Sequence, residues 1–208
     1  MIICIEGPDR IGKSTCCAHL ASRHGYSRMH FGRPEGSTDT ERSLYQKGSF
    51  TTLFTMAGAL RDQRAKVVLD RSHLGELVYG PIYRPNSQVD LGYIHALEAA
   101  DPGCMTLVML THRDPSVLRS RDDGLGFDIT RLEDEIAAFA VAFAGSRLRS
   151  KHIIDVTDRP VPSMLDELER LLGLPRKSDF GLEPEAVSVR FRHLIPIPGE
   201  GSPEFNGA

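Results

Sequence analysis

Short apolar runs alternate with longer amphipathic stretches over the first 175 residues of the chain. Runs of four to six mostly apolar residues are typical of buried strands, and they occur at residues 2–5, 66–70, 105–110 and 152–156. A weaker pattern at residues 27–31 predicts one further strand. Helical spacing of apolar residues predicts helices at 14–24, 44–64, 89–100, 115–121, 130–148 and 163–172, whereas residues 73–83 are ambiguous.

This alternation of strands and helices predicts a mostly parallel, doubly wound α/β sheet. Right-handed crossovers between parallel strands would place helices on both faces of the sheet. The carboxyl ends of the strands then share one edge, and ligands of such sheets bind at that edge.

Local signals predict several element boundaries. Residues 32–42 are rich in Gly, Pro, Ser and Thr and predict a loop, and the following helix is expected to break near Gly48. Thr130 and Glu133 are spaced as a capping box, which predicts a helix start. Gly173 is expected to close the last helix.

The strongest chemical signal is Gly-Pro-Asp-Arg-Ile-Gly-Lys-Ser-Thr at residues 7–15, which fits the phosphate-binding pattern G-x-x-x-x-G-K-[ST]. It lies between a predicted strand and a predicted helix, the context that the motif requires. The glycines allow backbone N–H groups to converge on phosphate oxygens, the lysine reaches the β- and γ-phosphates, and the serine hydroxyl holds Mg²⁺. The predicted residues for binding ATP in this loop are Gly7, Gly12, Lys13, Ser14 and Thr15.

A second acid, Asp70, closes the predicted strand at residues 66–70. At the carboxyl end of a strand beside the loop, it can join Ser14 in holding Mg²⁺. The alternative is an aspartate that caps the next helix. The neighbouring Arg71 is a candidate to contact a substrate phosphate or the transferred group, and its alternative is a surface arginine.

Four more charged residues are candidates for catalysis or nucleotide binding. Arg10, inside the loop, can stabilise charge that develops on the γ-phosphate, and Asp9 can orient an acceptor hydroxyl or take its proton. Arg119 and Arg121 precede a glycine-containing segment at 122–126, a predicted mobile lid, and can close over a nucleotide. A solvated surface charge is the alternative for each of the four.

Composition and charge indicate a globular protein and narrow its partners. The 208 residues are 40% hydrophobic and 25% charged, and the net charge of −3 does not favour broad nucleic-acid binding. No apolar run reaches the length of a membrane span, and a strand is predicted from residue 2, so we expect neither a signal peptide nor a membrane partner. The cysteines lack metal-site spacing, which predicts buried reduced thiols and a cytoplasmic location.

The loop sequence resembles that of thymidylate kinases with Asp-Arg inside the loop. Asp70-Arg71-Ser72 is similar to the Asp-Arg-Tyr motif of that family and to the Glu-Arg-Ser motif of deoxynucleoside kinases. Leu53-Phe54 followed by Arg61 resembles the family's substrate-side helix. The resemblance implies a three-layer P-loop NTPase fold with a small lid, an ATP–Mg²⁺ donor, and an acceptor nucleotide bound by Arg61 and Arg71. It also implies a homodimer formed through helices.

The resemblance covers about residues 1–173, so residues 1–175 are predicted to form a P-loop kinase domain. We expect residues 176–198 to form a C-terminal extension with an edge strand at 187–192, and residues 199–208 to form a disordered tail.

The departures from the family lie on the acceptor side. The family's Phe-Pro segment with an arginine for the acceptor phosphate is altered here to Phe31-Gly32-Arg33-Pro34, which leaves Arg33 as a candidate substrate-binding residue. Residues 73–84 are similar to bacteriophage-type members, some of which phosphorylate 5-hydroxymethyluracil in DNA. The acceptor is therefore either a free pyrimidine deoxynucleotide such as dTMP or hydroxymethyluracil in DNA, and a phage origin would place the protein in the host cytoplasm.

Two other classes of function stay open. A nucleotide switch or ATPase that acts on a protein partner would hydrolyse ATP slowly without an acceptor. A P-loop scaffold would bind nucleotide without turnover. The Asp-Arg pair and the predicted lid disfavour the switch, and the presence of Lys13, Ser14 and Asp70 disfavours the scaffold.

Overall fold

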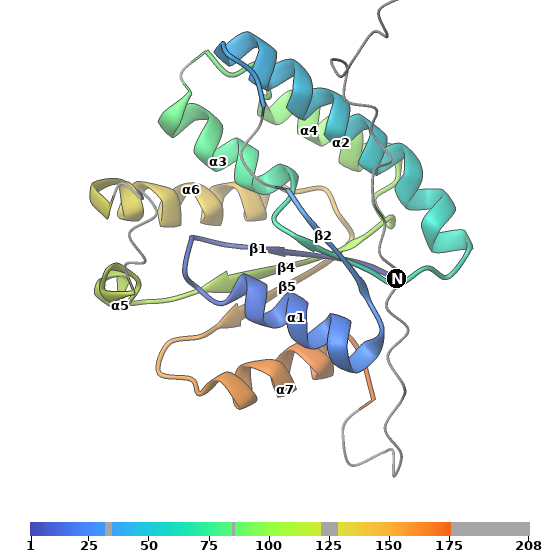
Figure 1. Cartoon of the computed structure of the whole chain (residues 1–208), viewed down its shortest axis with the longest axis vertical. Helices are drawn as coiled ribbons and strands as arrows, with labels where there is room; N and C mark the ends of the chain where they lie inside the picture. The colour runs from blue at the N-terminus through green and yellow to red at the C-terminus, as the bar shows by residue number, and fades with distance from the viewer. Residues whose placement is uncertain (32–34, 85, 122–128, 176–208) are drawn as a thin grey trace, which may run out of the picture.

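The computed structural model describes residues 1–31, 35–84, 86–121 and 129–175. Its centre is a sheet of five parallel strands in the order β2-β3-β1-β4-β5 (Figure 1). The strands are β1 (Ile2–Glu6), β2 (Ser27–His30), β3 (Val67–Asp70), β4 (Thr106–Thr111) and β5 (Ser150–Asp155). The five strands predicted within residues 1–175 and the parallel doubly wound sheet are therefore confirmed, whereas the edge strand predicted at 187–192 lies outside the described residues.

The strand β1 shows why helices cover both faces of the sheet. All five of its residues are buried, and successive side chains of a strand point to opposite faces. Ile2 and Cys4 pack into one core with helices above the sheet, whereas Ile3 and Ile5 pack into a second core with helices below it. The cysteines form no disulfide and are buried, as expected.

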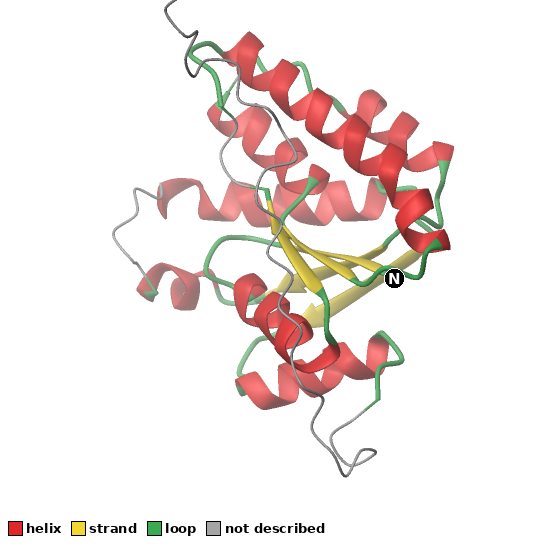
Figure 2. Ribbon diagram, turned by 45° about the vertical axis from the view of Figure 1, so that its right-hand side comes forward, coloured by secondary structure: helices red, strands yellow, loops and turns green. Residues whose placement is uncertain are grey.

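Figures 1 and 2 show the resulting three layers. Helices α1 (Lys13–His24) and α7 (Val161–Leu171) lie against one face. The helices on the other side of the sheet are α2 (Asp39–Asp62), α3 (His73–Tyr83), α4 (Leu91–Ala100) and α6 (Leu132–Gly145). A short helix, α5 (Pro115–Ser120), lies beside the edge of the sheet where the strands end.

The register of the strands brings the predicted site residues to one edge. Ile5 of β1 lies opposite Asp70 of β3 and opposite Val108 of β4, so β1 and β3 end at nearly the same level and β4 extends slightly beyond them. The loop after β1 and the acid that closes β3 are therefore neighbours across the sheet. This agrees with the prediction that the phosphate loop and Asp70 lie at the same edge of the sheet.

Two predicted boundaries around α2 are wrong. The helix begins at Asp39, inside the predicted loop at 32–42, because Thr38 and Glu41 form a capping box that satisfies the first backbone N–H groups. The helix also continues through Gly48, where a break was expected. A glycine costs a helix only about 1 kcal/mol relative to alanine, and the packing of the buried face of α2 offsets this.

The start of α6 also differs from its prediction. Residues Ile129–Arg131 form a 3-10 turn, and α6 begins at Leu132 without a side-chain cap, so the predicted capping box of Thr130 and Glu133 is wrong. At the end of α7, Gly173 has φ 62° and the N–H of Leu174 reaches the carbonyl of Glu169, as expected for a closing glycine.

Some predictions fall outside the described residues: the lid at 122–126, Arg33, the extension at 176–198 and the tail at 199–208. Among the residues that are described, no helix is both long enough and apolar enough to span a membrane.

Candidate active site

The loop between β1 and α1 is shaped by its two glycines. Gly7 has φ 135° and Gly12 has φ 109°, angles that residues with a β-carbon rarely adopt. A β-carbon on Gly7 would lie 2.6 Å from the carbonyl oxygen of Leu110 on β4, so only glycine fits there. Residues 7–12 can therefore turn tightly ahead of the N-terminus of α1, which is the geometry of a phosphate cradle.

The Lys13 ammonium group lies inside this loop. Its Nζ donates hydrogen bonds to the carbonyl oxygens of Gly7 at 2.8 Å and Pro8 at 2.6 Å, and it lies 3.3 Å from Oδ1 of Asp9. The side chain is buried, and this desolvation lowers the pKa of Lys13. The loop thus holds a positive charge at its centre, which suits the phosphates of a nucleotide.

Ser14 and Asp70 meet at the carboxyl edge of the sheet. The Ser14 hydroxyl donates to Oδ2 of Asp70 at 2.8 Å. Burial alone would raise the pKa of Asp70, but hydrogen bonds from Ser14 and Arg28 lower it, which keeps the carboxylate ionised. A hydroxyl and a carboxylate side by side are oxygen ligands of the kind that Mg²⁺ binds, so the residues fit this ion. Thr15 follows on the exposed side of the same helical turn.

Arg28 is a site residue that the sequence analysis missed. It projects from the edge strand β2 and donates to Oδ2 of Asp70, the same oxygen that Ser14 contacts. His30 approaches this oxygen too, with its Nδ1 at 3.8 Å. The pairing of His30 with Asp70 in the sheet brings both side chains to the edge, and this register cannot be read from the sequence.

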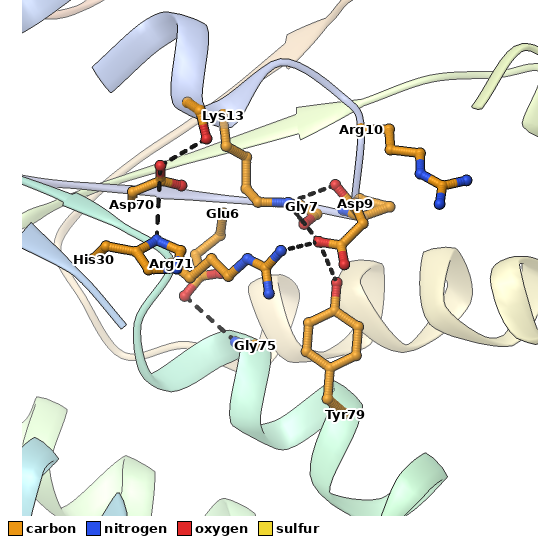
Figure 3. A network of polar contacts seen from close by, with 12 residues as sticks. Glu6, Gly7, Asp9, Arg10, Lys13, His30, Asp70, Arg71, Gly75 and Tyr79 are labelled. Carbon is orange, nitrogen blue, oxygen red and sulfur yellow. Dashed lines mark hydrogen bonds and ion pairs between the residues drawn. The ribbon is translucent and has the colours of Figure 1, made fainter. Parts of the chain in front are cut away.

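On the other side of Lys13, Asp9 and Arg71 form an ion pair (Figure 3). Nη2 of Arg71 donates to Oδ1 of Asp9 at 2.6 Å, and the hydroxyl of Tyr79 on α3 donates to the same oxygen at 3.4 Å. Arg71 has φ 68°, an uncommon angle for a residue with a β-carbon. The structure therefore brings together Asp9, Lys13 and Arg71, three candidates from the sequence, and adds Tyr79.

Glu6 is a second residue that the sequence analysis missed. It is fully buried at the end of β1, and its Oε1 accepts the N–H of Ser72 at 2.7 Å. Its other oxygen is buried and has no hydrogen-bond partner among the described residues. Burial raises the pKa of Glu6, although the positive charge of Lys13 opposes this. Glu6 ends an apolar strand, as Asp70 does, so the pattern that identified Asp70 could also have identified Glu6.

Glu135 adds another buried acid, from helix α6. It accepts a hydrogen bond from the hydroxyl of Tyr83 at 2.5 Å, and its second oxygen has no hydrogen-bond partner among the described residues. Burial raises the pKa of Glu135 to about 7, and the negative charge of Asp9 adds to this. The charges of Asp9, Lys13 and Arg71 also act on the pKa of Glu135, so this acid lies within electrostatic range of the loop.

The predicted arginines around the donor differ in their placement. Arg10 has φ 67°, and its side chain extends away from Asp9 and Arg71 (Figure 3). Arg121 reaches the loop, because its Nη1 donates to the carbonyl oxygen of Arg10 at 3.1 Å. Arg119 instead pairs with Glu133 at 2.7 Å in an exposed position. The structure thus brings Arg121, but not Arg119, to the phosphate loop.

The assignment of Arg61 to the acceptor is corrected by the structure. Arg61 lies in the last turn of α2 and pairs with Asp101 at 2.6 Å, just ahead of β4. A helix that connects parallel strands runs back to the edge where the strands begin. Arg61 is therefore at the edge opposite the phosphate loop and does not reach the site.

Comparison with known proteins supports the fold. No protein-family model and no curated protein matches the sequence of this chain. Solved structures that match include YorR of Bacillus subtilis in complex with phosphorylated GDP, at 20% identity over 83% of this chain and 96% of that chain, with a TM-score of 0.61. Thymidylate kinase of Candida albicans matches at 18% identity over 83% of this chain and 90% of that chain, with a TM-score of 0.58.

A third match is deoxyadenosine kinase of M. mycoides with bound dATP, at 14% identity over 83% of this chain and all of that chain (100%), with a TM-score of 0.54. Identities this low establish the architecture and leave the substrate open. The chain has the α/β P-loop NTPase fold, and its structural neighbours include kinases of nucleotides and nucleosides.

Proposed function

We propose that the protein is an ATP-dependent kinase that transfers the γ-phosphate to a thymidine-like pyrimidine deoxynucleotide. The observation that carries this proposal is that Asp9, an acid within the phosphate loop, contacts both Lys13 and Arg71. Oδ1 of Asp9 lies 3.3 Å from Nζ of Lys13 and 2.6 Å from Nη2 of Arg71. A nucleotide switch needs only the loop, whereas a kinase needs groups for an acceptor directly beside it.

On the donor side, the triphosphate is held by the loop amides, Lys13, Arg10 and Arg121. Ser14 and Asp70 would hold Mg²⁺, which supplies positive charge to the phosphate oxygens when bound. Lys13 stabilises the negative charge that develops on the transferred group, and its burial strengthens this interaction. Catalysis in this account is mainly positioning and electrostatics, as phosphoryl transfer requires.

On the acceptor side, Arg71 binds a phosphate group of the acceptor and Asp9 orients it. The side chain of Arg71 is 33% exposed, so Arg71 can contact a ligand while it keeps its ion pair with Asp9. The Tyr79 hydroxyl supports the same carboxylate. These groups form the side of the site across Lys13 from the Mg²⁺ ligands.

Glu6 favours a hydroxyl acceptor over a phosphate acceptor. A hydroxyl must lose a proton as it attacks, whereas the phosphate of dTMP is already ionised and would be repelled by a buried carboxylate. Oε2 of Glu6 has no hydrogen-bond partner among the described residues, so this oxygen is free to accept the proton of a hydroxyl. We therefore favour the hydroxymethyl group of hydroxymethyluracil in DNA, and a base in a duplex would have to be flipped out.

The test offers γ-labelled ATP and Mg²⁺ with three acceptors in parallel: dTMP, thymidine, and duplex DNA that contains hydroxymethyluracil. We expect label on a hydroxyl acceptor, and a loss of about a hundredfold or more in Glu6→Gln. The matched control is Glu133→Gln, because Glu133 is an exposed acid.

Label on dTMP that survives Glu6→Gln would contradict the hydroxyl acceptor and keep the kinase. Free phosphate without any labelled acceptor would overturn the kinase proposal and favour the nucleotide switch.

A further inference from the structure

A second cluster of ionisable side chains lies where α1 and α7 end, outside the site described above. Nε2 of His19 lies 2.7 Å from Oε1 of Glu169, and Nε2 of His24 lies 2.9 Å from the same oxygen. The three ligand atoms all lie within 4.8 Å of one another. The cluster therefore presents two imidazole nitrogens and a carboxylate oxygen to one point.

The surroundings of the cluster favour a cation. Helices α1 and α7 each follow a parallel strand on the same face of the sheet, so they run in the same direction and their last turns are adjacent (Figure 1). His24 ends α1, and Glu169 lies in the last turn of α7. The C-terminus of a helix carries partial negative charge, and here two such ends adjoin a carboxylate with only 2% of its side chain exposed.

One oxygen of this carboxylate is crowded by nitrogen atoms. Arg23 also approaches Oε1 of Glu169, with its Nε at 3.1 Å, so three nitrogen atoms converge on one oxygen. A carboxylate oxygen has two lone pairs and accepts two hydrogen bonds well. A metal ion bound between the two imidazoles and the carboxylate would take their nitrogen and oxygen atoms as ligands. The imidazole nitrogens would then no longer crowd one oxygen.

We propose that His19, His24 and Glu169 bind a divalent transition-metal ion such as Zn²⁺ that links α1 to α7. Imidazole nitrogens suit Zn²⁺, Co²⁺ and Ni²⁺, whereas Mg²⁺ prefers oxygen ligands, so this site selects a different ion from the Ser14–Asp70 pair. Metal–ligand bonds of about 2.1 Å at a tetrahedral angle separate ligand atoms by about 3.4 Å. From 2.7 Å and 2.9 Å, the imidazole nitrogens need to move away from Oε1 only by about 0.7 Å and about 0.5 Å, and water can complete the coordination.

The proposal does not depend on the kinase reaction, because the cluster lies at the edge of the sheet where the strands begin. It assigns the metal a structural role, in which the ion fastens the last helix of the described chain to the helix that follows the phosphate loop. A ligand that binds only the folded state raises the melting temperature in proportion to the logarithm of its concentration. Binding and stability can therefore be measured without any assay of activity.

In the experiment, the full chain is first treated with a chelator and the chelator is removed. ZnCl₂ alone is then titrated in, and calorimetry measures the binding and the melting temperature. We expect one ion per chain and a rise in melting temperature with added Zn²⁺. His19→Gln and His24→Gln should each weaken binding about tenfold or more, because each removes a ligand. Arg23→Gln should strengthen binding about threefold to tenfold, because it removes a competing cation. The matched control is His152→Gln on β5, which should bind as the wild type does.

Co²⁺ gives a second readout, since its visible absorption reports coordination by nitrogen and oxygen. Two results would overturn the proposal: no binding of Zn²⁺ at millimolar concentration, or binding that is unchanged in both His19→Gln and His24→Gln. The second result would assign the metal to another site, such as Ser14 and Asp70. Circular dichroism of each variant in chelator checks that it folds.

Discussion

Glu135 offers a quantitative test of the packing between α3 and α6. Its side chain is fully buried, it accepts a hydrogen bond from Tyr83, and its pKa is raised to about 7. In the unfolded chain the same carboxyl ionises near its ordinary value of 4.5. Between these two values the unfolded state loses a proton that the folded state keeps. Stability is therefore highest at acid pH with respect to this group, and it falls as the pH rises through 7.

The size of the effect follows from the two pKa values. The difference between 4.5 and about 7 corresponds to about 3 kcal/mol of unfolding free energy, which is fully lost by about pH 8. Glu135→Gln removes the ionisation and keeps a carbonyl oxygen that can accept from Tyr83. We therefore expect the variant to be about 2–3 kcal/mol more stable than the wild type at about pH 8, and nearly equal to it below about pH 5.

Urea denaturation of both proteins at several pH values measures this difference. The matched control is Glu133→Gln on the same helix, an exposed acid that pairs with Arg119 and should change stability by less than about 0.5 kcal/mol at any pH. Equal stability of Glu135→Gln and wild type across the pH range would refute the argument. A variant less stable than the wild type at about pH 8 would contradict it as well.

Three further predictions concern the phosphate loop and the metal ligands. Gly7→Ala should lower the free energy of unfolding, measured in urea, by about 3 kcal/mol or more, and Gly25→Ala should lower it by about 1 kcal/mol. Both glycines have positive φ, but only at Gly7 would a backbone oxygen lie 2.6 Å from the new β-carbon. Equal costs would show that this contact is absent. Arg28→Gln should lower the Mg²⁺ concentration for half-maximal ATP binding by about threefold to tenfold, because Arg28 shares Oδ2 of Asp70. Asp70→Asn should raise this Mg²⁺ concentration about tenfold or more. Titration with Mg²⁺, followed by the fluorescence of a bound nucleotide, measures it, and unchanged values in the two variants would contradict both predictions.

The parts of the site that could be predicted from the sequence are those that local pattern determines. Glycine spacing locates the phosphate loop, and an apolar strand that ends in an acid places Asp70 at the ligand edge. The same rule, applied to β1, would have identified Glu6. Arg61 was misplaced because its family resemblance was weighed without the direction of its helix, which returns to the opposite edge.

Other contacts depend on packing between segments that are distant in sequence. Arg28 reaches Asp70 only through the register of β2 against β3. Glu135 is buried because α6 packs on α3, where Tyr83 meets it across 52 positions of the chain. Neither the register of an edge strand nor the rotation of a helix follows from apolar periodicity, so these residues required the three-dimensional structure.

The central claim, that Lys13 serves phosphoryl transfer, is tested most directly by Lys13→Ala in the labelled-ATP assay with hydroxymethyluracil DNA, thymidine and dTMP. Lys47→Ala, a change in a partly exposed lysine on α2, is the control. The account predicts that Lys13→Ala loses transfer by about a hundredfold or more while circular dichroism shows a folded protein, and that Lys47→Ala transfers as the wild type does. Transfer that persists in folded Lys13→Ala would contradict the mechanism.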